Sequence, residues 1–425
     1  MLMEAEHGQA VFAIIIICIM YRHSQALPGR PIYATEDIEK GPWKTITFTP
    51  SYHDHTIFFD DDGRVYIIWG GGKLRVAELK PDLSGIKEGT ERIFIENASA
   101  PSGDNVGLPA EGSQLFKVNG KYYLFNITWP KGGMRTVVIH RADHINGPWE
   151  GRVALQDKGV AQGGLIDTPD GRWFAYLFRD NGAVGRIPYL VPVKWEEGWP
   201  VLGIDGKVPE RLELPASKGL IPGIVASDEF TRKKKEAALP LVWQWNHNPD
   251  NSLWSVSERK GYLRLKTGRV DTDFLSARNT LTQRTVGPVC SGTTSVDVSN
   301  MKEGDFAGLA LLQKKYGFVG VKYENGVKKI VMVSAQADKP EEVESLPLNQ
   351  TVIFLKAECD FTDLKDIASF YYSLDGKKWI KIGSQLKMAY TLPHFMGYRF
   401  GLFNYATKAA GGYVDFDYFR ISDKK

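Results

Sequence analysis

The sequence predicts an all-β protein in which a β-propeller is followed by a β-sandwich. Three observations support this fold class. Strand patterns follow one another with little helical periodicity, a turn phrase recurs through the first half, and strands of alternating polarity replace it from Ser227 onward. Repeats of about 40–50 residues with a few strands each are typical of propeller blades. About 200 residues of alternating strands suit a two-sheet sandwich.

The chain is expected to have three parts. Residues 1–30 form an atypical apolar N-terminus, residues 31–222 an incomplete propeller, and residues 223–425 the sandwich. The boundary near residue 222 rests on Val208–Ile224, where several Pro and Gly residues separate the two strand textures. A length of 425 residues agrees with two or three domains, since a domain takes about 100–200 residues.

The N-terminal part has several interpretations. Val11–Met20 is apolar but only about half as long as a membrane span. It resembles the apolar region of a signal peptide, yet Glu4 and Glu6 precede it where such a signal carries Lys or Arg. It lies about one repeat before the first turn phrase, so it is also interpreted as the inner strand of a damaged blade. A further alternative is that residues 1–30 are out-of-frame sequence.

Each turn phrase predicts a β-hairpin. Asp62–Tyr66, Asn119–Tyr123 and Asp170–Phe174 each contain an Asn-Gly or Asp-Gly pair, then a basic residue and the start of an apolar strand. This pattern is typical of type I′ turns. A second phrase, Gly-Pro-Trp at residues 41–43 and 147–149, closes strands in two of the repeats.

The second half is expected to form a sandwich with neighbouring ends. Alternating strand patterns run from Thr294 to Glu358, and a hairpin follows around Asp375-Gly376. The segments Asp228–Phe230 and Asp415–Phe419 at its two ends are predicted to be neighbouring strands.

Composition excludes several classes of protein. With 43% hydrophobic and 12% aromatic residues, the chain has enough apolar surface to fold. The 53 basic and 50 acidic residues leave no electrostatic footprint of a nucleic-acid partner. Three cysteines are too few for a disulfide framework and match no zinc pattern. No membrane span is expected, and the sequence leaves the oligomeric state open.

Two carboxylates are the strongest candidates for chemistry. Asp54 and Glu111 each lie several residues before a turn phrase, at the start of the inner strand of a blade. Carboxylates that enter one channel from adjacent blades can hydrolyse glycosidic bonds, because one protonates the leaving oxygen while others stabilise charge or activate water. The alternatives are a strand-capping Asp and a surface Glu.

Other side chains are weaker candidates. Gln162 could present its amide to the channel, and Trp69 and Trp129 could stack on a sugar unless they fill the core. Arg186, in a glycine-rich loop, could bind a carboxylate or sugar hydroxyls, or form a structural ion pair.

Metal ligands are not expected in this half. His53 and His55 would project to the same side of a strand, but no third ligand is visible nearby. The run Asp60–Gly63 resembles a calcium loop but lacks the later ligands, so it is interpreted as a solvated turn.

Taken together, these phrases resemble glycoside hydrolase family 43, which includes β-xylosidases and α-L-arabinofuranosidases. The motifs that carry the resemblance are His53–Gly72, Glu111–Phe125, Ala161–Phe178 and Gly182–Pro200. The resemblance implies a five-bladed propeller followed by a concanavalin A-like jelly roll. It also implies an oligo- or polysaccharide substrate from plant cell walls, with terminal arabinofuranosyl or xylosyl residues as the groups removed. No cofactor is required for that chemistry, and a periplasmic or extracellular location is expected.

The resemblance assigns roles to single residues. Glu111 matches the general acid, and Asp54 matches the aspartate that tunes the pKa of the acid and orients it. Arg186 matches an arginine that contacts substrate. Structural calcium is expected near Asp228 and Asp415 in the sandwich.

One member of the catalytic set is not found. The family inverts configuration with a third carboxylate, a general base in an Asp-Pro phrase of the first blade, whereas no Asp precedes Asp37 here. The first blade is therefore expected to be missing from a truncated or frame-disrupted chain. Without its base the chain is expected to lose activity by orders of magnitude, and the alternative function is a catalytically silent carbohydrate-binding protein.

Overall fold

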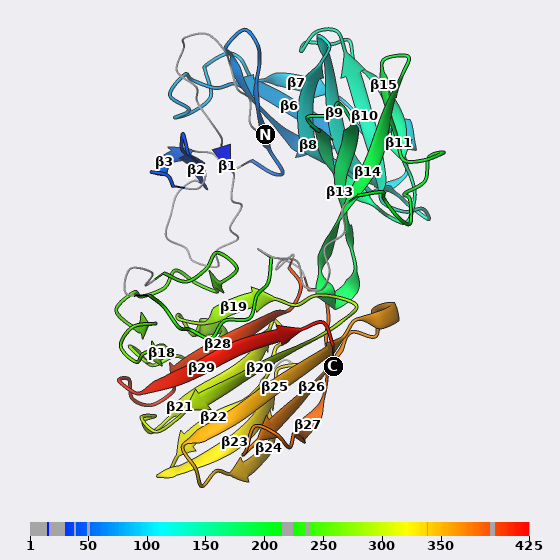
Figure 1. The fold of residues 1–425 in the computed structure, drawn as a ribbon. Coiled ribbons are helices and arrows are strands. Elements are labelled where there is room, and N and C mark those ends of the chain that lie inside the picture. Colours follow the sequence, from blue (N-terminus) through cyan, green and yellow to red (C-terminus); the bar gives the residue numbers. More distant parts are fainter. Residues whose placement is uncertain are drawn as a thin grey trace. The chain divides into compact units, whose positions relative to one another are not determined.

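The computed structural model describes residues 15–16, 30–37, 40–48, 52–214, 224–233, 238–337, 339–391 and 396–424. In these ranges the chain forms strands β1 to β29, four short 3₁₀ helices and no α-helix, which confirms the all-β prediction. The chain divides into two compact units (Figure 1), of which the first comprises Met1–Arg179 and Ile187–Glu213 and the second Asp180–Arg186 and Leu214–Lys425. The division between Glu213 and Leu214 lies a few residues before residue 222.

The first unit consists of antiparallel sheets that follow one another along the chain, as propeller blades do. One sheet has three strands and three sheets have four, each in sequence order. Strand β8 contacts both β4 and β12, so the first strands of the three four-stranded blades are neighbours. The strands are β1 (Ile15–Ile16), β2 (Arg30–Ala34) and β3 (Lys44–Phe48); β4 (Thr56–Phe59), β5 (Val65–Gly71), β6 (Lys73–Glu78) and β7 (Arg92–Ile95); β8 (Val106–Val118), β9 (Lys121–Pro130), β10 (Thr136–Ala142) and β11 (Glu150–Leu155); and β12 (Ala161–Asp167), β13 (Trp173–Asp180), β14 (Arg186–Glu196) and β15 (Trp199–Leu202).

The apolar N-terminal run contributes a strand to the first sheet. Ile15 pairs with Ala34 and Ile16 with Tyr33, so β1 lies antiparallel to β2. This pairing agrees with the interpretation of the run as part of a blade. The rest of Val11–Met20 lies outside the described residues.

All three turn phrases form hairpins, but only one has the predicted turn type. Asn119 and Gly120 both have positive φ (50° and 77°), as a type I′ turn requires. In the other two hairpins only the glycine is left-handed, with φ of 81° at Gly63 and 82° at Gly171. These loops are longer: the Gly63 N–H donates to the Asp60 carbonyl and the Gly171 N–H to the Thr168 carbonyl, so a four-residue turn that ends in a left-handed glycine closes each of them.

An ion pair between a buried carboxylate and a partly buried lysine joins the first four-stranded blade to the next. The Asp60 carboxylate accepts hydrogen bonds from Lys117 Nζ (2.8 Å) on β8 and Tyr122 OH (2.7 Å) on β9. Burial raises the pKa of Asp60, but these hydrogen bonds outweigh it and hold the pKa below its usual value. The solvated-turn prediction is therefore wrong for Asp60, which is buried, while Asp61 and Asp62 are exposed.

The substitution Asp60→Asn should destabilise the first unit by about 2 kcal/mol, because it removes the buried carboxylate that binds Lys117 and Tyr122, while Lys117 keeps its second partner Asp61 (3.0 Å). Asp62→Asn, two residues on, removes an exposed pair with Arg64 and should cost less than about 1 kcal/mol. Scanning calorimetry of both variants checks this, and equal losses would contradict the anchoring role of Asp60.

Strand β10 carries a buried histidine. His140 is 4% exposed, its Nδ1 has no hydrogen-bond partner, and burial lowers its pKa to about 4. The folded state therefore keeps this imidazole neutral in a range where the unfolded chain protonates it.

Stability should consequently fall as the pH drops from about 6.5 to about 4, by up to about 3 kcal/mol from His140 alone. Above pH 6.5 neither state is protonated there, so the penalty vanishes. Denaturant unfolding at several pH values, compared with His140→Leu, isolates this contribution. The same pH dependence in both proteins would rule it out.

The second unit is a sandwich of two seven-stranded antiparallel sheets. One sheet has the order β16-β19-β28-β21-β22-β23-β24 and the other β17-β18-β29-β20-β25-β26-β27. Their strands are β16 (Gln244–Trp245), β17 (Trp254–Ser255), β18 (Leu263–Lys266), β19 (Leu281–Arg284), β20 (Val289–Asp297), β21 (Asp305–Leu312), β22 (Gly317–Glu324), β23 (Val327–Ser334), β24 (Glu341–Pro347), β25 (Val352–Asp360), β26 (Ile367–Ser373), β27 (Ile380–Lys387), β28 (Arg399–Ala406) and β29 (Tyr413–Ser422).

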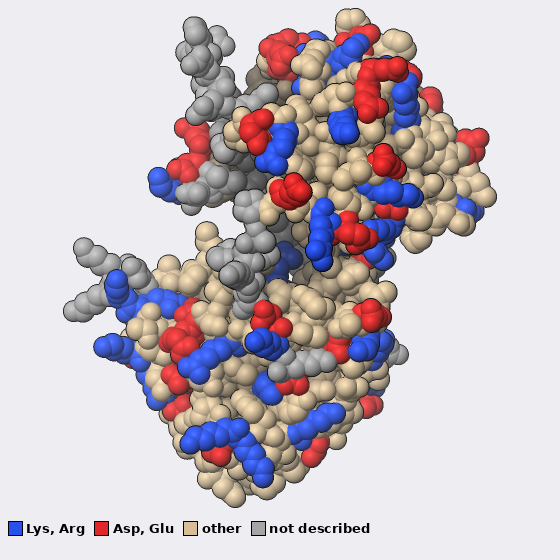
Figure 2. Space-filling model, turned by 45° about the vertical axis from the view of Figure 1, so that its right-hand side comes forward, with Lys and Arg blue, Asp and Glu red and all other residues tan. Residues whose placement is uncertain are grey.

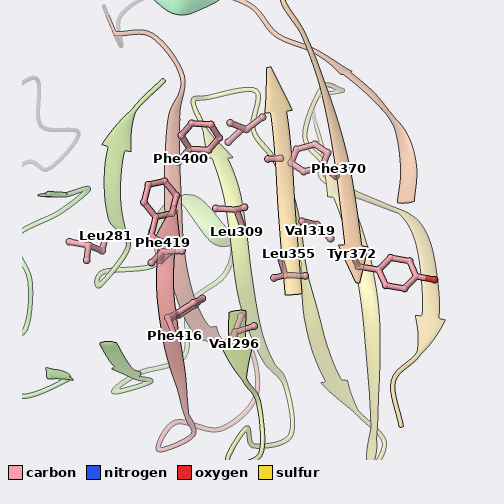
Figure 3. Close-up of a cluster of buried hydrophobic side chains, with 14 of the residues drawn as sticks. Leu281, Val296, Leu309, Val319, Leu355, Phe370, Tyr372, Phe400, Phe416 and Phe419 are labelled. Carbon is pink, nitrogen blue, oxygen red and sulfur yellow. The ribbon is translucent and has the colours of Figure 1, made fainter. Parts of the chain in front are cut away.

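Apolar side chains from both sheets of the sandwich meet in one core. Figure 3 shows Leu309 and Phe400 of one sheet and Leu355 and Phe416 of the other within one cluster of buried side chains, and all four are fully buried. The predicted hairpin around Asp375 is present as β26 and β27. The predicted pairing of the two ends is confirmed by an antiparallel bridge between Asp228 and Phe419.

The surface charge agrees with the balanced composition. On the face displayed in Figure 2, basic and acidic side chains are interspersed, and neither sign dominates a large area. The described residues contain no helix with the length and apolar character of a membrane span.

Candidate active site

A turn that precedes β4 supplies the first part of the site. Asp54 has a left-handed backbone (φ 43°), and the Gly70 N–H on β5 donates to the His53 carbonyl (3.3 Å). The prediction that His53 and His55 share one side of a strand is wrong, because both lie in this turn. Their imidazoles have different partners: His53 Nε2 contacts Glu111 Oε2, and His55 Nδ1 contacts the Tyr52 carbonyl.

Irregular pairing of β8 with β9 positions Glu111. The register slips on both sides of Glu111, which lies opposite Ile127, so β8 contains extra residues there. Such bulges turn a side chain away from its regular direction and are common beside active sites. Gly112 has φ of 64°, and Asn126 Nδ2 donates to the Glu111 carbonyl (3.2 Å) and to Ser113 Oγ (2.9 Å).

The structure brings Asp54 and Glu111 together through His53. His53 Nε2 lies 2.9 Å from Glu111 Oε2 and 3.9 Å from Asp54 Oδ2. The Glu111 and Asp54 side chains are 21% and 27% exposed, and that of His53 is 62% exposed. Two half-buried carboxylates from adjacent blades therefore face one accessible imidazole, and their catalytic roles remain predictions.

Gln162 lies beside the same strand segment. It has φ of 54° at a register slip at the start of β12. A methyl group on Gly112 would lie 2.3 Å from Gln162 Nε2, so the amide packs directly on the Gly112 backbone. The third blade thus places a polar amide next to the segment that carries Glu111.

The two candidate tryptophans have different surroundings. Trp69 is 7% exposed in a hydrophobic cluster, with its ring centroid 4.2 Å from that of Tyr52, so it fills the core. Trp129 is 42% exposed at the end of β9, and its Nε1 donates to the Gly133 carbonyl (3.0 Å). Trp129 is the more accessible of the two, with the Arg135 guanidinium over its ring, 5.3 Å from the centroid.

Arg186 belongs to the second unit and is the first residue of β14, directly after the turn that follows β13. Its Nε donates to Asp180 Oδ1 (3.1 Å) and to the Tyr390 hydroxyl (3.3 Å). This turn is held by the sandwich, where the Tyr398 N–H donates to the Ala183 carbonyl (3.0 Å). The contact of Arg186 with substrate remains a prediction.

The residues named for calcium do not fit that ion. Asp228 accepts from Arg232 Nη2 (2.6 Å) and Trp243 Nε1 (2.9 Å), and Asp415 accepts from Arg264 Nε (2.7 Å). Each carboxylate already has a guanidinium as its counter-charge, whereas calcium sites need several uncommitted oxygen ligands. In the part of the chain that the structure describes, only His53, Asp54 and Glu111 bring three potential ligand atoms within 4.8 Å of one another.

Comparisons with known proteins agree with this architecture. A model described as glycosyl hydrolases family 43 matches residues 22–200, and one described as β-xylosidase C-terminal concanavalin A-like domain matches residues 227–422. A solved structure of a protein from Bacteroides eggerthii, described as bifunctional GH43-CE, is 69% identical with a TM-score of 0.91. That match covers 94% of this chain and 52% of the other, so the chain spans about half of that protein.

Two curated relatives carry the names of specific enzymes. A β-xylosidase of Formosa agariphila is 28% identical over 465 residues, which cover 94% of this chain and 74% of the relative. A non-reducing end α-L-arabinofuranosidase of Bacteroides ovatus is 25% identical over 304 residues, which cover 66% of this chain and 54% of the relative.

A propeller with carboxylates converging from adjacent blades, followed by a concanavalin-like sandwich, defines this protein as a glycosidase of the propeller class. The chain belongs to glycoside hydrolase family 43. The predicted family and the architecture of propeller plus sandwich are confirmed.

Reasoning from the sequence missed two residues of the site. His53 was considered only as a metal ligand, although its place directly before Asp54 puts it at the same blade edge. Nothing in the sequence marked Gly112, because a glycine is needed there only to leave room for Gln162, which is fifty positions away along the chain.

The contact between Gly112 and Gln162 can be tested by Gly112→Ala. The added methyl group would clash with the amide and strain a left-handed backbone, so Glu111 should shift and kcat/KM should fall by about 100-fold. Gly120→Ala in the β8–β9 turn is the matched control, because its φ is also positive (77°) but no atom lies within 4 Å of the new methyl group. It should lose stability but keep its activity; equal losses of activity would contradict the assignment.

Proposed function

We propose that this protein is an inverting exo-glycosidase that removes terminal xylosyl or arabinofuranosyl residues from plant cell-wall oligo- or polysaccharides. The observation that carries the proposal is the meeting of Asp54 and Glu111 at the edges of adjacent blades, bridged by His53. The xylosidase and arabinofuranosidase names among the relatives support the choice of sugar.

In this mechanism Glu111 acts as the general acid. Its carboxyl group donates a proton to the glycosidic oxygen as the bond to the sugar breaks, and the leaving alcohol departs neutral. Asp54 stays ionised, orients the acid from the neighbouring turn and stabilises positive charge that develops on the sugar ring. The Trp129 ring and the Gln162 amide are candidates for sugar contacts.

Inversion also needs a base on the opposite face of the sugar to activate water. In inverting enzymes the acid and base lie about 6.5–9.5 Å apart. Azide can take the place of the activated water, so an assay with azide measures whether water activation limits the rate.

Nitrophenyl α-L-arabinofuranoside and β-D-xyloside test the activity directly. The chain should release nitrophenol from at least one of them, and Glu111→Ala should reduce the rate by about 100-fold or more. Azide needs no deprotonation to attack, so it should accelerate nitrophenol release and yield a glycosyl azide of inverted configuration, visible by NMR.

Each outcome separates the candidate functions. The preferred nitrophenyl substrate identifies the sugar, and azide products of retained configuration would disprove the inverting mechanism. If neither water nor azide gave release above the Glu111→Ala variant, while calorimetry showed sugar binding, the protein would be a silent carbohydrate-binding protein instead.

A further inference from the structure

A histidine hydrogen-bonded to the proposed acid has no part in the mechanism so far. His53 Nε2 lies 2.9 Å from Glu111 Oε2, in direct hydrogen-bond contact. The imidazole is also 3.9 Å from Asp54 Oδ2, so it lies between the two carboxylates. Of the two carboxylates, only Glu111 is within hydrogen-bond distance of this nitrogen.

We propose that His53 is a positioning residue for the general acid: its Nε2–H donates to Glu111 Oε2 and thereby assigns the catalytic proton to Oε1. The proposal rests on the proposed function, in which Glu111 is the acid. It goes further by naming which oxygen of that carboxyl group carries the proton and which residue selects it.

The chemical argument follows from the two oxygens of a carboxylic acid. In the protonated form one oxygen carries the hydrogen and the other is only an acceptor. An N–H donor can bond only to the acceptor oxygen, so donation to Oε2 leaves the proton on Oε1. In the opposite imidazole tautomer, Nε2 would accept the proton of Glu111 and withhold it from the leaving group.

The surroundings of Glu111 support this assignment. Oε2 borders the β5 backbone as well as His53, because a methyl group on Gly71 would lie 3.8 Å from it. The Glu111 backbone is fixed by Asn126. With Oε2 held against β5 and the imidazole, Oε1 is the oxygen that remains to approach the leaving group.

The turn holds His53 firmly enough for this role. The His53 carbonyl accepts from the Gly70 N–H (3.3 Å), and the preceding Tyr52 ring packs on the buried Trp69 (4.2 Å). An imidazole can also donate without carrying a charge, whereas a lysine or arginine here would favour the ionised carboxylate.

Dependence on the leaving group tests the proposal. His53→Phe should lower kcat/KM by about 100-fold for phenyl glycosides, whose poor leaving group needs the acid, and by less than about 3-fold for 2,4-dinitrophenyl glycosides, whose leaving group needs no proton. His53→Gln, which keeps an N–H donor, should restore most of the phenyl activity. The assays are run with azide so that water activation does not limit the rate.

Two controls make the result decisive. His55→Phe alters the neighbouring imidazole, which contacts Tyr52 instead of Glu111, and should show no selective loss. Glu111→Gln should show the same dependence on the leaving group as His53→Phe. Equal losses on both substrates with His53→Phe would mean a merely structural role and overturn the inference, whereas no dependence in Glu111→Gln would overturn the proposed function itself.

A measurement without turnover gives an independent answer. Long-range ¹H–¹⁵N NMR of the imidazoles, assigned by comparison with His53→Gln, reports which ring nitrogen carries hydrogen. The Nε2–H form of His53 is expected, and its signal should move in Glu111→Gln. An Nδ1–H form would overturn the inference even if every substrate assay were silent.

Discussion

The candidate active site depends on the irregular backbone of β8. A regular strand paired with β9 would alternate its side chains between the two faces of the blade, and only the extra residues around Glu111 change that direction. The same irregularity places Gly112 where the Gln162 amide can pack on its backbone. Because β8 contacts both β4 and β12, one distorted strand allows side chains from three blades to meet.

Strand β8 carries a residue of the site and also a residue that stabilises the first unit. Lys117, six residues after Glu111, forms the ion pair with Asp60 that ties two blades together. The turn that contains Asp60 closes the hairpin of β4, and the turn that contains Asp54 begins it. Both ends of β4 are therefore bound to β8, by an ion pair at one end and by the His53–Glu111 hydrogen bond at the other, so movement between the blades would disturb both.

The sequence was informative where short-range rules act. The position of Asp54 and Glu111 before recurring turns was sufficient to predict that they meet, because equivalent positions of adjacent blades lie at the same edge. Orientation within a turn was not predictable: the left-handed backbone at Asp54 separates His53 from His55, which a strand would have kept together. The calcium prediction disagrees with the geometry for another reason, since the Arg264 partner of Asp415 is 151 residues away in sequence.

Three positions with a left-handed backbone lie close to Glu111. Asp54 and Gln162 are non-glycine residues with left-handed backbones, and Gly112 takes the same conformation between them. Each such non-glycine residue costs of order 1 kcal/mol and persists only where its surroundings determine it. The Gly70 N–H holds the turn at His53 by a hydrogen bond, and Gln162 takes its conformation at the register slip in β12. Since the strained positions lie just before β4, within β8 and at the start of β12, the same backbone conformation recurs in three blades beside the segment that carries Glu111.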